Sequence, residues 1–199
     1  FDAKLANLHY RAPHLLAQEV QARLGEPKAD RVVLDAGCGT GLCGPLLKPW
    51  ARELEGVDLS AGMLARAGPR GVYDRLAKAE LTAHILALPA GSVDLIVSAD
   101  TLCYFGDLAA VTQASARALA PQGWLMFTVE ALPEDAAEPF HLDPHGRYSH
   151  RADYVSEVLA AAGLQQQTLQ PVHLRTEGGK PVAGSVVSAC KTEAARSSS

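Results

Sequence analysis

A glycine-rich turn directly behind a short apolar strand is the feature that most constrains the fold of this chain. Residues 32–34 are apolar, Asp35 follows them, and glycines stand at Gly37, Gly39 and Gly41. Glycines at this spacing let the backbone take left-handed conformations and approach a ligand closely at the carboxyl end of a strand. The turn therefore predicts an α/β fold that binds a nucleotide-like ligand at one edge of a parallel sheet.

The charge of Asp35 restricts the ligand that this turn can hold. NAD and FAD place a pyrophosphate on such a turn, and a carboxylate would repel it. S-adenosylmethionine carries an ammonium and a sulfonium instead, which a carboxylate attracts. Residues 39–44 match the dinucleotide pattern GxGxxG only four residues beyond Asp35, whereas the register next to the strand has Leu42 in place of the third glycine. The turn thus favours S-adenosylmethionine over a dinucleotide.

A second acid, Asp58, ends the next expected strand, 21 residues after Gly37. A carboxylate at this place can accept hydrogen bonds from both ribose hydroxyls, in NAD and S-adenosylmethionine alike. Leu59 and Met63 would add an apolar surface beside the adenine. These residues predict a ribose and adenine site without distinguishing the two cofactors.

Length and composition fit one globular domain that binds a small molecule. The chain has 199 residues, of which 48% are hydrophobic and 20% charged, with a net charge of −4. No cluster of Lys and Arg provides a basic surface, so bulk nucleic acid is not an expected partner. No apolar run is long enough to span a membrane and no signal-peptide pattern is present, so we expect a cytoplasmic protein. The cysteines form no CxxC pair and are expected as reduced thiols: Cys38, Cys43, Cys103 and Cys190.

Strand and helix patterns alternate five times along the chain, which indicates a doubly covered parallel sheet. Two further strands without a helix between them predict an antiparallel hairpin at the end. We therefore expect an α/β, Rossmann-like, mostly parallel seven-stranded sheet with helices on both faces and a terminal antiparallel hairpin. The expected strands are 31–36, 53–58, 77–81, 93–98, 123–129, 164–175 and 182–191, and the expected helices include 41–48 and 151–162.

Four segments make up the expected domain organisation. Residues 1–28 predict an N-terminal cap of two short helices interrupted by Pro13, and residues 29–193 the cofactor-binding domain. Within it, residues 131–150 are rich in Pro, His, Asp and Glu and are a candidate substrate lid. Residues 194–199 are expected to be a disordered tail. Because the chain begins with Phe rather than Met, we expect it to be a piece of a longer protein.

With these motifs in place, the chain resembles the class I S-adenosylmethionine-dependent methyltransferases. More narrowly, it resembles bacterial predicted methyltransferases that are sometimes fused to tetratricopeptide repeats. The resemblance covers nearly all of the chain, and it is specific for the cofactor half rather than for the acceptor half. It rests on residues 33–41, 56–60, 63–64, 93–96 and 119–123, and for the narrower group on 10–13, 71–74, 79–82 and 146–148.

The resemblance implies a role for residues at each strand end. It places Asp35 near the ammonium of the cofactor, with the turn around Cys38 approaching the methionine part and Asp58 holding the ribose. Glu80 would bind the adenine amino group and the main chain of Leu81 a ring nitrogen, although an exposed Glu without a ligand is the alternative. Asp100 would lie between the methionine end and the acceptor, or else cap a turn. The implied cofactor set is Asp35, Gly37, Cys38, Gly39, Asp58, Leu59, Met63, Glu80, Leu81 and Asp100.

Methyl transfer asks the protein chiefly to align the acceptor and exclude water, because the sulfonium already leaves well. An acceptor that carries a proton also needs a base matched to neutral pH. Polar lid residues that merely face water are the alternative for the lid candidates. No helix-compatible pair of histidines with an acid is present, so we expect no metal site. The candidate bases are Tyr104, His145 and His150, and the candidate acceptor-binding residues are Arg147, which would grip an anionic group, Tyr148 and Tyr10.

The sequence thus predicts a methyltransferase that moves a methyl group from S-adenosylmethionine to an unidentified small-molecule acceptor. Two alternatives stay open. One is a nicotinamide-dependent oxidoreductase on the same kind of sheet. The other is a non-catalytic protein that binds S-adenosylmethionine as a sensor or for a partner subunit, which a weak acceptor site would fit.

Overall fold

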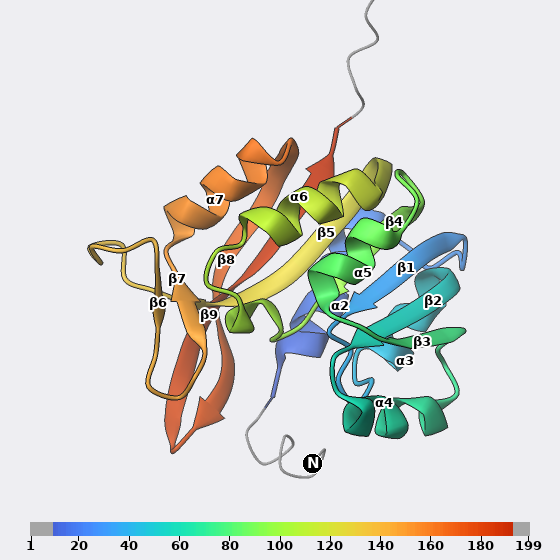
Figure 1. The fold of residues 1–199 in the computed structure, drawn as a ribbon, viewed down its shortest axis with the longest axis horizontal. Coiled ribbons are helices and arrows are strands. Elements are labelled where there is room, and N and C mark those ends of the chain that lie inside the picture. Colours follow the sequence, from blue (N-terminus) through green and yellow to red (C-terminus); the bar gives the residue numbers. More distant parts are fainter. Residues whose placement is uncertain (1–9, 193–199) are drawn as a thin grey trace, which may run out of the picture.

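A computed structural model describes residues 10–192, in which helices cover both faces of one mixed β-sheet (Figure 1). No helix within these residues is long and apolar enough to cross a membrane. The strands are β1 (Arg31–Ala36), β2 (Ala51–Asp58), β3 (Arg75–Lys78), β4 (Val93–Ser98), β5 (Leu119–Ala131), β6 (Phe140–Leu142), β7 (Tyr148–His150), β8 (Leu164–Glu177) and β9 (Lys180–Lys191). The helices are α2 (Ala12–Leu24), α3 (Gly44–Leu47), α4 (Ala61–Ala67), α5 (Leu81–Ala87), α6 (Ala109–Ala118) and α7 (Ala152–Ala161), with short 3-10 helices η1 (Lys48–Trp50), η2 (Gly68–Arg70) and η3 (Leu102–Tyr104).

The strand order confirms the mostly parallel sheet with its terminal hairpin, but the sheet within residues 10–192 has nine strands rather than seven, because β6 and β7 of the candidate lid join it. The strands β3, β2, β1, β4 and β5 lie side by side in this order, and all four pairs are parallel. β9 pairs antiparallel with residues 124–130 of β5, and β8 pairs antiparallel with β9. The chain order of the strands reverses between β1 and β4. In open α/β sheets, ligands bind at such a reversal, outside the carboxyl ends of the strands.

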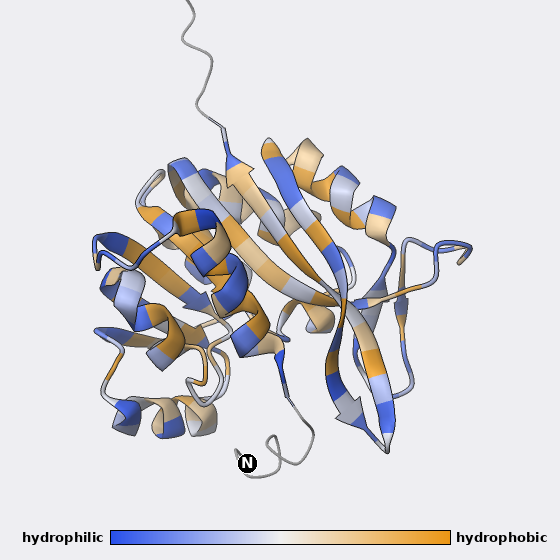
Figure 2. Ribbon diagram, turned by 180° about the vertical axis from the view of Figure 1, so that it is seen from behind, coloured by the Kyte–Doolittle hydropathy of each residue, from blue (hydrophilic) through white to orange (hydrophobic). Residues whose placement is uncertain are grey.

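Two apolar clusters hold the helices on the sheet. Phe127 and Leu159 belong to the cluster under α5, α6 and α7, and Leu16 belongs to the cluster under α2 and α3. Neighbouring residues of a central strand serve opposite clusters, since Val33 packs with Leu16 and Leu34 with Phe127. Strands that are buried on both faces are largely apolar, and the central strands in Figure 2 are accordingly coloured mostly orange or pale. Burial on both faces therefore explains the short apolar runs by which the sequence indicates these strands.

The structure corrects three predicted element boundaries. The predicted N-terminal cap contains one helix within the described residues, because Pro13 lies in the first turn of α2, where proline is tolerated. The helix expected at 41–48 is only the four-residue α3, followed by η1. The third strand ends at Lys78 rather than at residue 81, because Glu80 caps α5 and accepts hydrogen bonds from the N–H groups of Thr82 and Ala83. The predictions for residues 1–9 and for the tail at 194–199 lie outside the described residues.

The candidate lid contains a short hairpin rather than an irregular loop. β6 and β7 pair with each other, and β7 also pairs parallel with Glu130 and Ala131 at the end of β5. The N–H of Asp143 donates to the carbonyl of Arg147 at 2.9 Å, and Gly146, at a φ of +85°, donates to the carbonyl of Asp143. This pairing places the tip of the hairpin beside the carboxyl ends of the parallel strands.

Candidate active site

A cavity of about 610 Å³ lies at the carboxyl ends of the parallel strands, where the strand order reverses. Its wall contains residues from the glycine turn, from the ends of β2 and β4 and from the candidate lid. Nine of the ten residues predicted for the cofactor contribute to it: Gly37, Cys38, Gly39, Asp58, Leu59, Met63, Glu80, Leu81 and Asp100. The cavity is therefore placed where the sequence expects a nucleotide-like ligand.

The glycine turn is held in a conformation that other residues adopt at a cost. Gly37, Gly39 and Gly41 have φ values of +77°, +54° and +80°, in the left-handed region that favours glycine. A Cβ atom on Gly37 would lie 2.2 Å from the hydroxyl oxygen of Thr101, which donates to the Gly37 carbonyl at 3.1 Å. The N–H groups of Gly37 and Cys38 both donate to the carbonyl of Val57. The turn is thus fixed against β2 and the end of β4 with its backbone exposed to the cavity.

Asp58 connects this turn to the start of α4. One carboxylate oxygen accepts the N–H of Gly39 at 2.9 Å, and the other accepts the N–H of Ser60 at 2.8 Å. Ser60 in turn caps α4, because its hydroxyl accepts the N–H of Met63 at 3.3 Å. Each carboxylate oxygen has a further lone pair for a hydroxyl group. This arrangement can hold a diol at the mouth of the cavity.

Next to Asp58, the cavity wall presents apolar surface beside the α5 helix cap. The Leu59 side chain is 68% exposed although it is apolar, and Met63 lies one helical turn further along the same wall. Glu80 is exposed and uses both carboxylate oxygens for the α5 cap, which lowers its pKa. Glu80 therefore caps α5 and also lines the cavity. A flat aromatic ring with an amino group fits such a surface.

Asp35, predicted near the cofactor ammonium, is not part of the cavity wall. Its side chain is 1% exposed, and its carboxylate accepts a hydrogen bond from the Tyr73 hydroxyl at 2.6 Å. Burial raises the pKa of Asp35 to about 7, and the Tyr73 hydrogen bond acts against that rise. Within this structure Asp35 thus supports the turn through its hydrogen bond with Tyr73.

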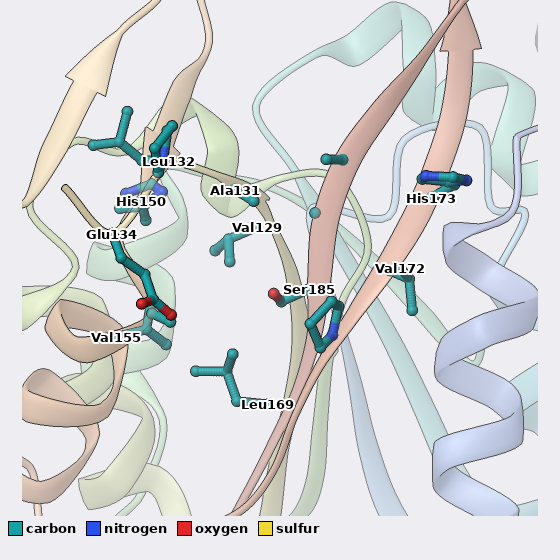
Figure 3. Close-up of a pocket in the computed structure, with 15 residues that line it drawn as sticks. Val129, Ala131, Leu132, Glu134, His150, Val155, Leu169, Val172, His173 and Ser185 are labelled. Atoms are coloured by element: carbon teal, nitrogen blue, oxygen red, sulfur yellow. The ribbon is translucent and has the colours of Figure 1, made fainter. Parts of the chain in front are cut away.

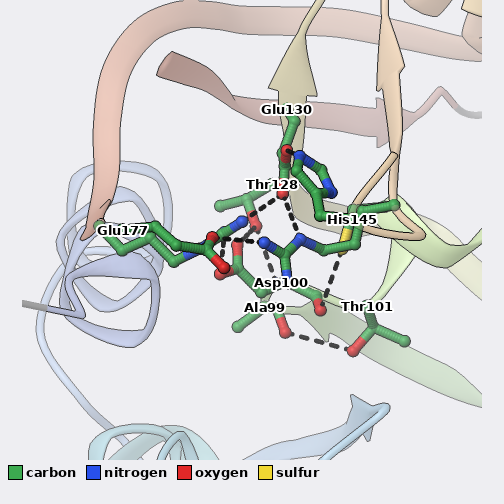
Figure 4. Close-up of polar contacts among 10 residues, drawn as sticks. Ala99, Asp100, Thr101, Thr128, Glu130, His145 and Glu177 are labelled. Atoms are coloured by element: carbon green, nitrogen blue, oxygen red, sulfur yellow. Dashed lines mark hydrogen bonds and ion pairs between the residues drawn. The ribbon is translucent and has the colours of Figure 1, made fainter. Parts of the chain in front are cut away.

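An ionic cluster of five residues borders the part of the cavity furthest from Asp58 (Figure 4): Asp100, Glu130, Arg147, Arg175 and Glu177. Arg175 is 6% exposed and pairs with Asp100 at 3.0 Å, with Glu177 at 3.2 Å and with Glu130. Arg147, from the candidate lid, donates to Glu130 at 2.8 Å and also pairs with Glu177. The cluster thereby joins the ends of β4, β5 and β8 to the lid hairpin.

Asp100 is held in an unusual backbone conformation inside this cluster. It has a φ of +47°, and its N–H donates to the hydroxyl of Thr128 at 2.9 Å. That hydroxyl donates in turn to the Asp100 carboxylate at 3.1 Å. Burial raises the pKa of Asp100, although the Arg175 guanidinium acts to lower it. A non-glycine residue held in the left-handed region by its surroundings is typical of functional sites.

The predicted acceptor-side residues divide into two groups. Tyr10, Tyr104 and Arg147 line the cavity, and the Tyr104 side chain is 62% exposed. Burial raises the pKa of Tyr10 well above its ordinary value, so its hydroxyl stays protonated at neutral pH. These three side chains surround the cavity from the N-terminal segment, from η3 and from the lid.

His145, His150 and Tyr148 lie outside the cavity wall. His145 stands at the hairpin tip, with its Nε2 atom 3.7 Å from Glu130. Tyr148 packs edge-on against Phe140. His150 is 2% exposed, its Nε2 atom lies 2.9 Å from the Gly106 carbonyl, and burial lowers its pKa. It lines a second cavity of about 500 Å³ between α7 and the β8–β9 hairpin (Figure 3) rather than the first cavity.

The sequence analysis missed Glu130, Arg175 and Glu177. Each stands near the end of a strand. The pattern of apolar residues along a strand does not indicate which polar residue at its end faces a cavity. A weak signal exists in β8, where Arg175 and Glu177 are two positions apart and therefore share one face of the strand, which indicates a charged pair there. Only the pairing of β9 with β5 brings that face to the carboxyl end of β4.

Comparison with known proteins agrees with this geometry. A family model described as a methyltransferase domain matches residues 8–169. The malonyl-[acyl-carrier protein] O-methyltransferase of Yersinia pestis is 34% identical over 126 residues, which are 63% of this chain and 45% of that protein. The human methyltransferase-like protein 27 is 38% identical over 98 residues, which are 49% of this chain and 40% of that protein. The chain thus spans less than half the length of these two relatives.

Solved structures share the fold over nearly the whole chain. An S-adenosylmethionine-dependent methyltransferase from Mesorhizobium loti has a TM-score of 0.65 at 25% identity, and the match covers 87% of this chain and 96% of that one. A geranyl diphosphate C-methyltransferase from Streptomyces coelicolor, solved with S-adenosyl-L-homocysteine, has a TM-score of 0.71 at 18% identity, covering 90% and 77%. The chain belongs to the S-adenosylmethionine-dependent methyltransferases, a family of class I fold whose cofactor is S-adenosylmethionine.

Proposed function

We propose that this protein transfers a methyl group from S-adenosylmethionine to a small polar molecule bound in the cavity at the end of β4. The observation that carries the proposal is the composition of one continuous wall. The glycine turn and Asp58 stand at one end of the cavity, and the ionic cluster, which includes Asp100, stands at the other. Donor and acceptor can therefore meet in a single space, as an in-line displacement requires.

On the donor side, the proposal assigns the ribose to Asp58 and the methionine part to the backbone of Gly37, Cys38 and Gly39. The adenine would lie against Leu59 and Met63, with its amino group at Glu80 and a ring nitrogen at the Leu81 main chain. The cavity lining and the hydrogen bonds of Asp58 support this assignment. Asp35 supports the turn only indirectly, through its hydrogen bond with Tyr73.

On the acceptor side, the proposal replaces the histidine bases with Asp100. Asp100 lines the cavity, and burial raises its pKa toward the range in which a base works at neutral pH. Tyr104 and Arg147 would orient the acceptor, because both line the same end of the cavity. The relatives named above act on an acyl carrier protein and a prenyl diphosphate, and these acceptors share no obvious core. The acceptor is thus assigned here only as a small polar molecule.

Calorimetric titration of the purified chain with S-adenosylhomocysteine and with NADH tests the donor assignment. We expect binding of S-adenosylhomocysteine and none of NADH, and the opposite result would contradict the proposal. Tritium transfer from labelled S-adenosylmethionine into fractions of a metabolite extract then tests the reaction. Labelled product that is lost in Asp100→Asn, with unchanged S-adenosylhomocysteine affinity, supports Asp100 as base. Cofactor binding without any labelled product would favour the non-catalytic alternative.

A further inference from the structure

A group of three side chains at the lid hairpin has the composition of a metal site. One ligand atom each from Glu130, Asp143 and His145 can be chosen so that all three lie within 4.8 Å of one another. The Nε2 atom of His145 is 3.7 Å from the Oε2 atom of Glu130. Two carboxylates and one imidazole are a donor set that first-row divalent cations accept. From this juxtaposition we propose that the hairpin binds a divalent cation such as Mn²⁺ at the border of the cavity.

Glu130 supplies a buried side chain to this group. Its side chain is 6% exposed, and both arginines of the ionic cluster bind the same atom, Oε1. The second oxygen, Oε2, lies 3.7 Å from the Nε2 atom of His145. Because both arginines bind Oε1, Oε2 keeps its lone pairs for another partner. A cation between Glu130 and His145 (Figure 4) would be bound by this oxygen and by the imidazole.

The charges around the group favour a dication. Four carboxylates lie together here, those of the cluster residues Asp100, Glu130 and Glu177 and that of Asp143. They face two guanidiniums, those of Arg147 and Arg175, so an excess of two negative charges remains. Because two of these carboxylates belong to buried or nearly buried side chains, solvent screens the excess poorly. One divalent cation neutralises it.

The backbone of the hairpin tip is built to present the two lid ligands. Asp143 closes the tip through its main-chain hydrogen bonds with Arg147 and Gly146, so its side chain is not needed for the turn. Gly146 reverses the chain at a positive φ, which brings His145 back over the end of β5. A cation held here would tie the hairpin to β5. Three protein ligands also leave coordination positions for water or for an oxygen of a bound molecule.

Titration of the tag-free chain with Mn²⁺, followed by electron paramagnetic resonance of the free ion, tests the site without cofactor or acceptor. We expect one Mn²⁺ bound per chain, displaced by Zn²⁺, and at least about tenfold weaker binding in Asp143→Asn and His145→Ala. Both residues stand at the hairpin tip, outside the two apolar clusters, so these variants should fold, which circular dichroism checks. His141→Ala is the matched control, because His141 lies on the same hairpin outside the group, and it should bind like the parent.

Absence of Mn²⁺ binding in the parent chain overturns the proposal. Equal binding in the parent and in His145→Ala overturns it as well, since the ion would then sit elsewhere. Neither result bears on the methyl transfer, because the measurement contains no S-adenosylmethionine. Conversely, failure to bind S-adenosylhomocysteine would leave the Mn²⁺ result unaffected.

Discussion

Replacing Asp58 by alanine tests the donor site most directly. The change removes the proposed ribose contact and also frees the N–H groups of Gly39 and Ser60, which the carboxylate accepts at 2.9 and 2.8 Å. A hydrogen bond to a charged group contributes about 1.5–3 kcal/mol. Since about 1.4 kcal/mol is a factor of ten in affinity, binding of S-adenosylhomocysteine should weaken about tenfold to a hundredfold. Asp58→Asn keeps one acceptor oxygen and should lie between alanine and the parent.

Calorimetric titration with S-adenosylhomocysteine measures this loss, and Asp74→Ala is the matched control. The Asp74 carboxylate also accepts a backbone N–H, that of Leu54 at 2.7 Å, and a second donor, Lys48, at 2.8 Å. It lies outside the cavity wall, so its removal should lower the melting temperature and leave the affinity within about twofold. An Asp58→Ala protein that is folded and binds like the parent would refute the ribose assignment.

Three further substitutions probe the support of the site. Asp35→Asn should alter the pH dependence of stability. Because the pKa of Asp35 is raised to about 7, the unfolding free energy of the parent should fall by about 4 kcal/mol as the pH rises from about 4 to about 8, at about 1.4 kcal/mol per pH unit. If urea denaturation gives the same difference in unfolding free energy between parent and variant at every pH, this prediction is contradicted. Gly37→Ala should lower the unfolding free energy by more than about 2 kcal/mol, because a Cβ at a φ of +77° meets the Thr101 side chain. A smaller loss of unfolding free energy in urea denaturation would show that the turn can relax. Arg175→Met should lower the unfolding free energy by about 3–5 kcal/mol in the same assay, because it leaves buried carboxylates unpaired. An unchanged unfolding free energy would mean that water solvates the ionic cluster.

Local sequence signals were sufficient for the fold and for the donor half of the cavity. Strands buried on both faces are largely apolar, and the turn after β1 needs glycines at positive φ, so both features are written in consecutive residues. The position of Asp58 in the cavity wall was predictable for the same reason, because its place at the end of β2 follows from the strand itself. The parallel order then fixes which edge of the sheet carries the ligand.

Only the tertiary structure decided the acceptor half. Arg175 reaches Asp100 because β9 pairs with β5 and carries β8 across the sheet edge, a contact between residues 75 positions apart in the chain. Strand pairing also decides that His150 faces the second cavity. Side chains alternate along β7, and the pairing of β7 with the last two residues of β5 sets which face of the sheet His150 takes. Asp35 lies outside the cavity wall for a related reason. Its charge is evident in the sequence, but the direction of its side chain depends on Tyr73, which a distant segment supplies. The sequence by itself thus determined the fold and the donor, whereas long-range pairing and side-chain direction determined what faces the methyl group.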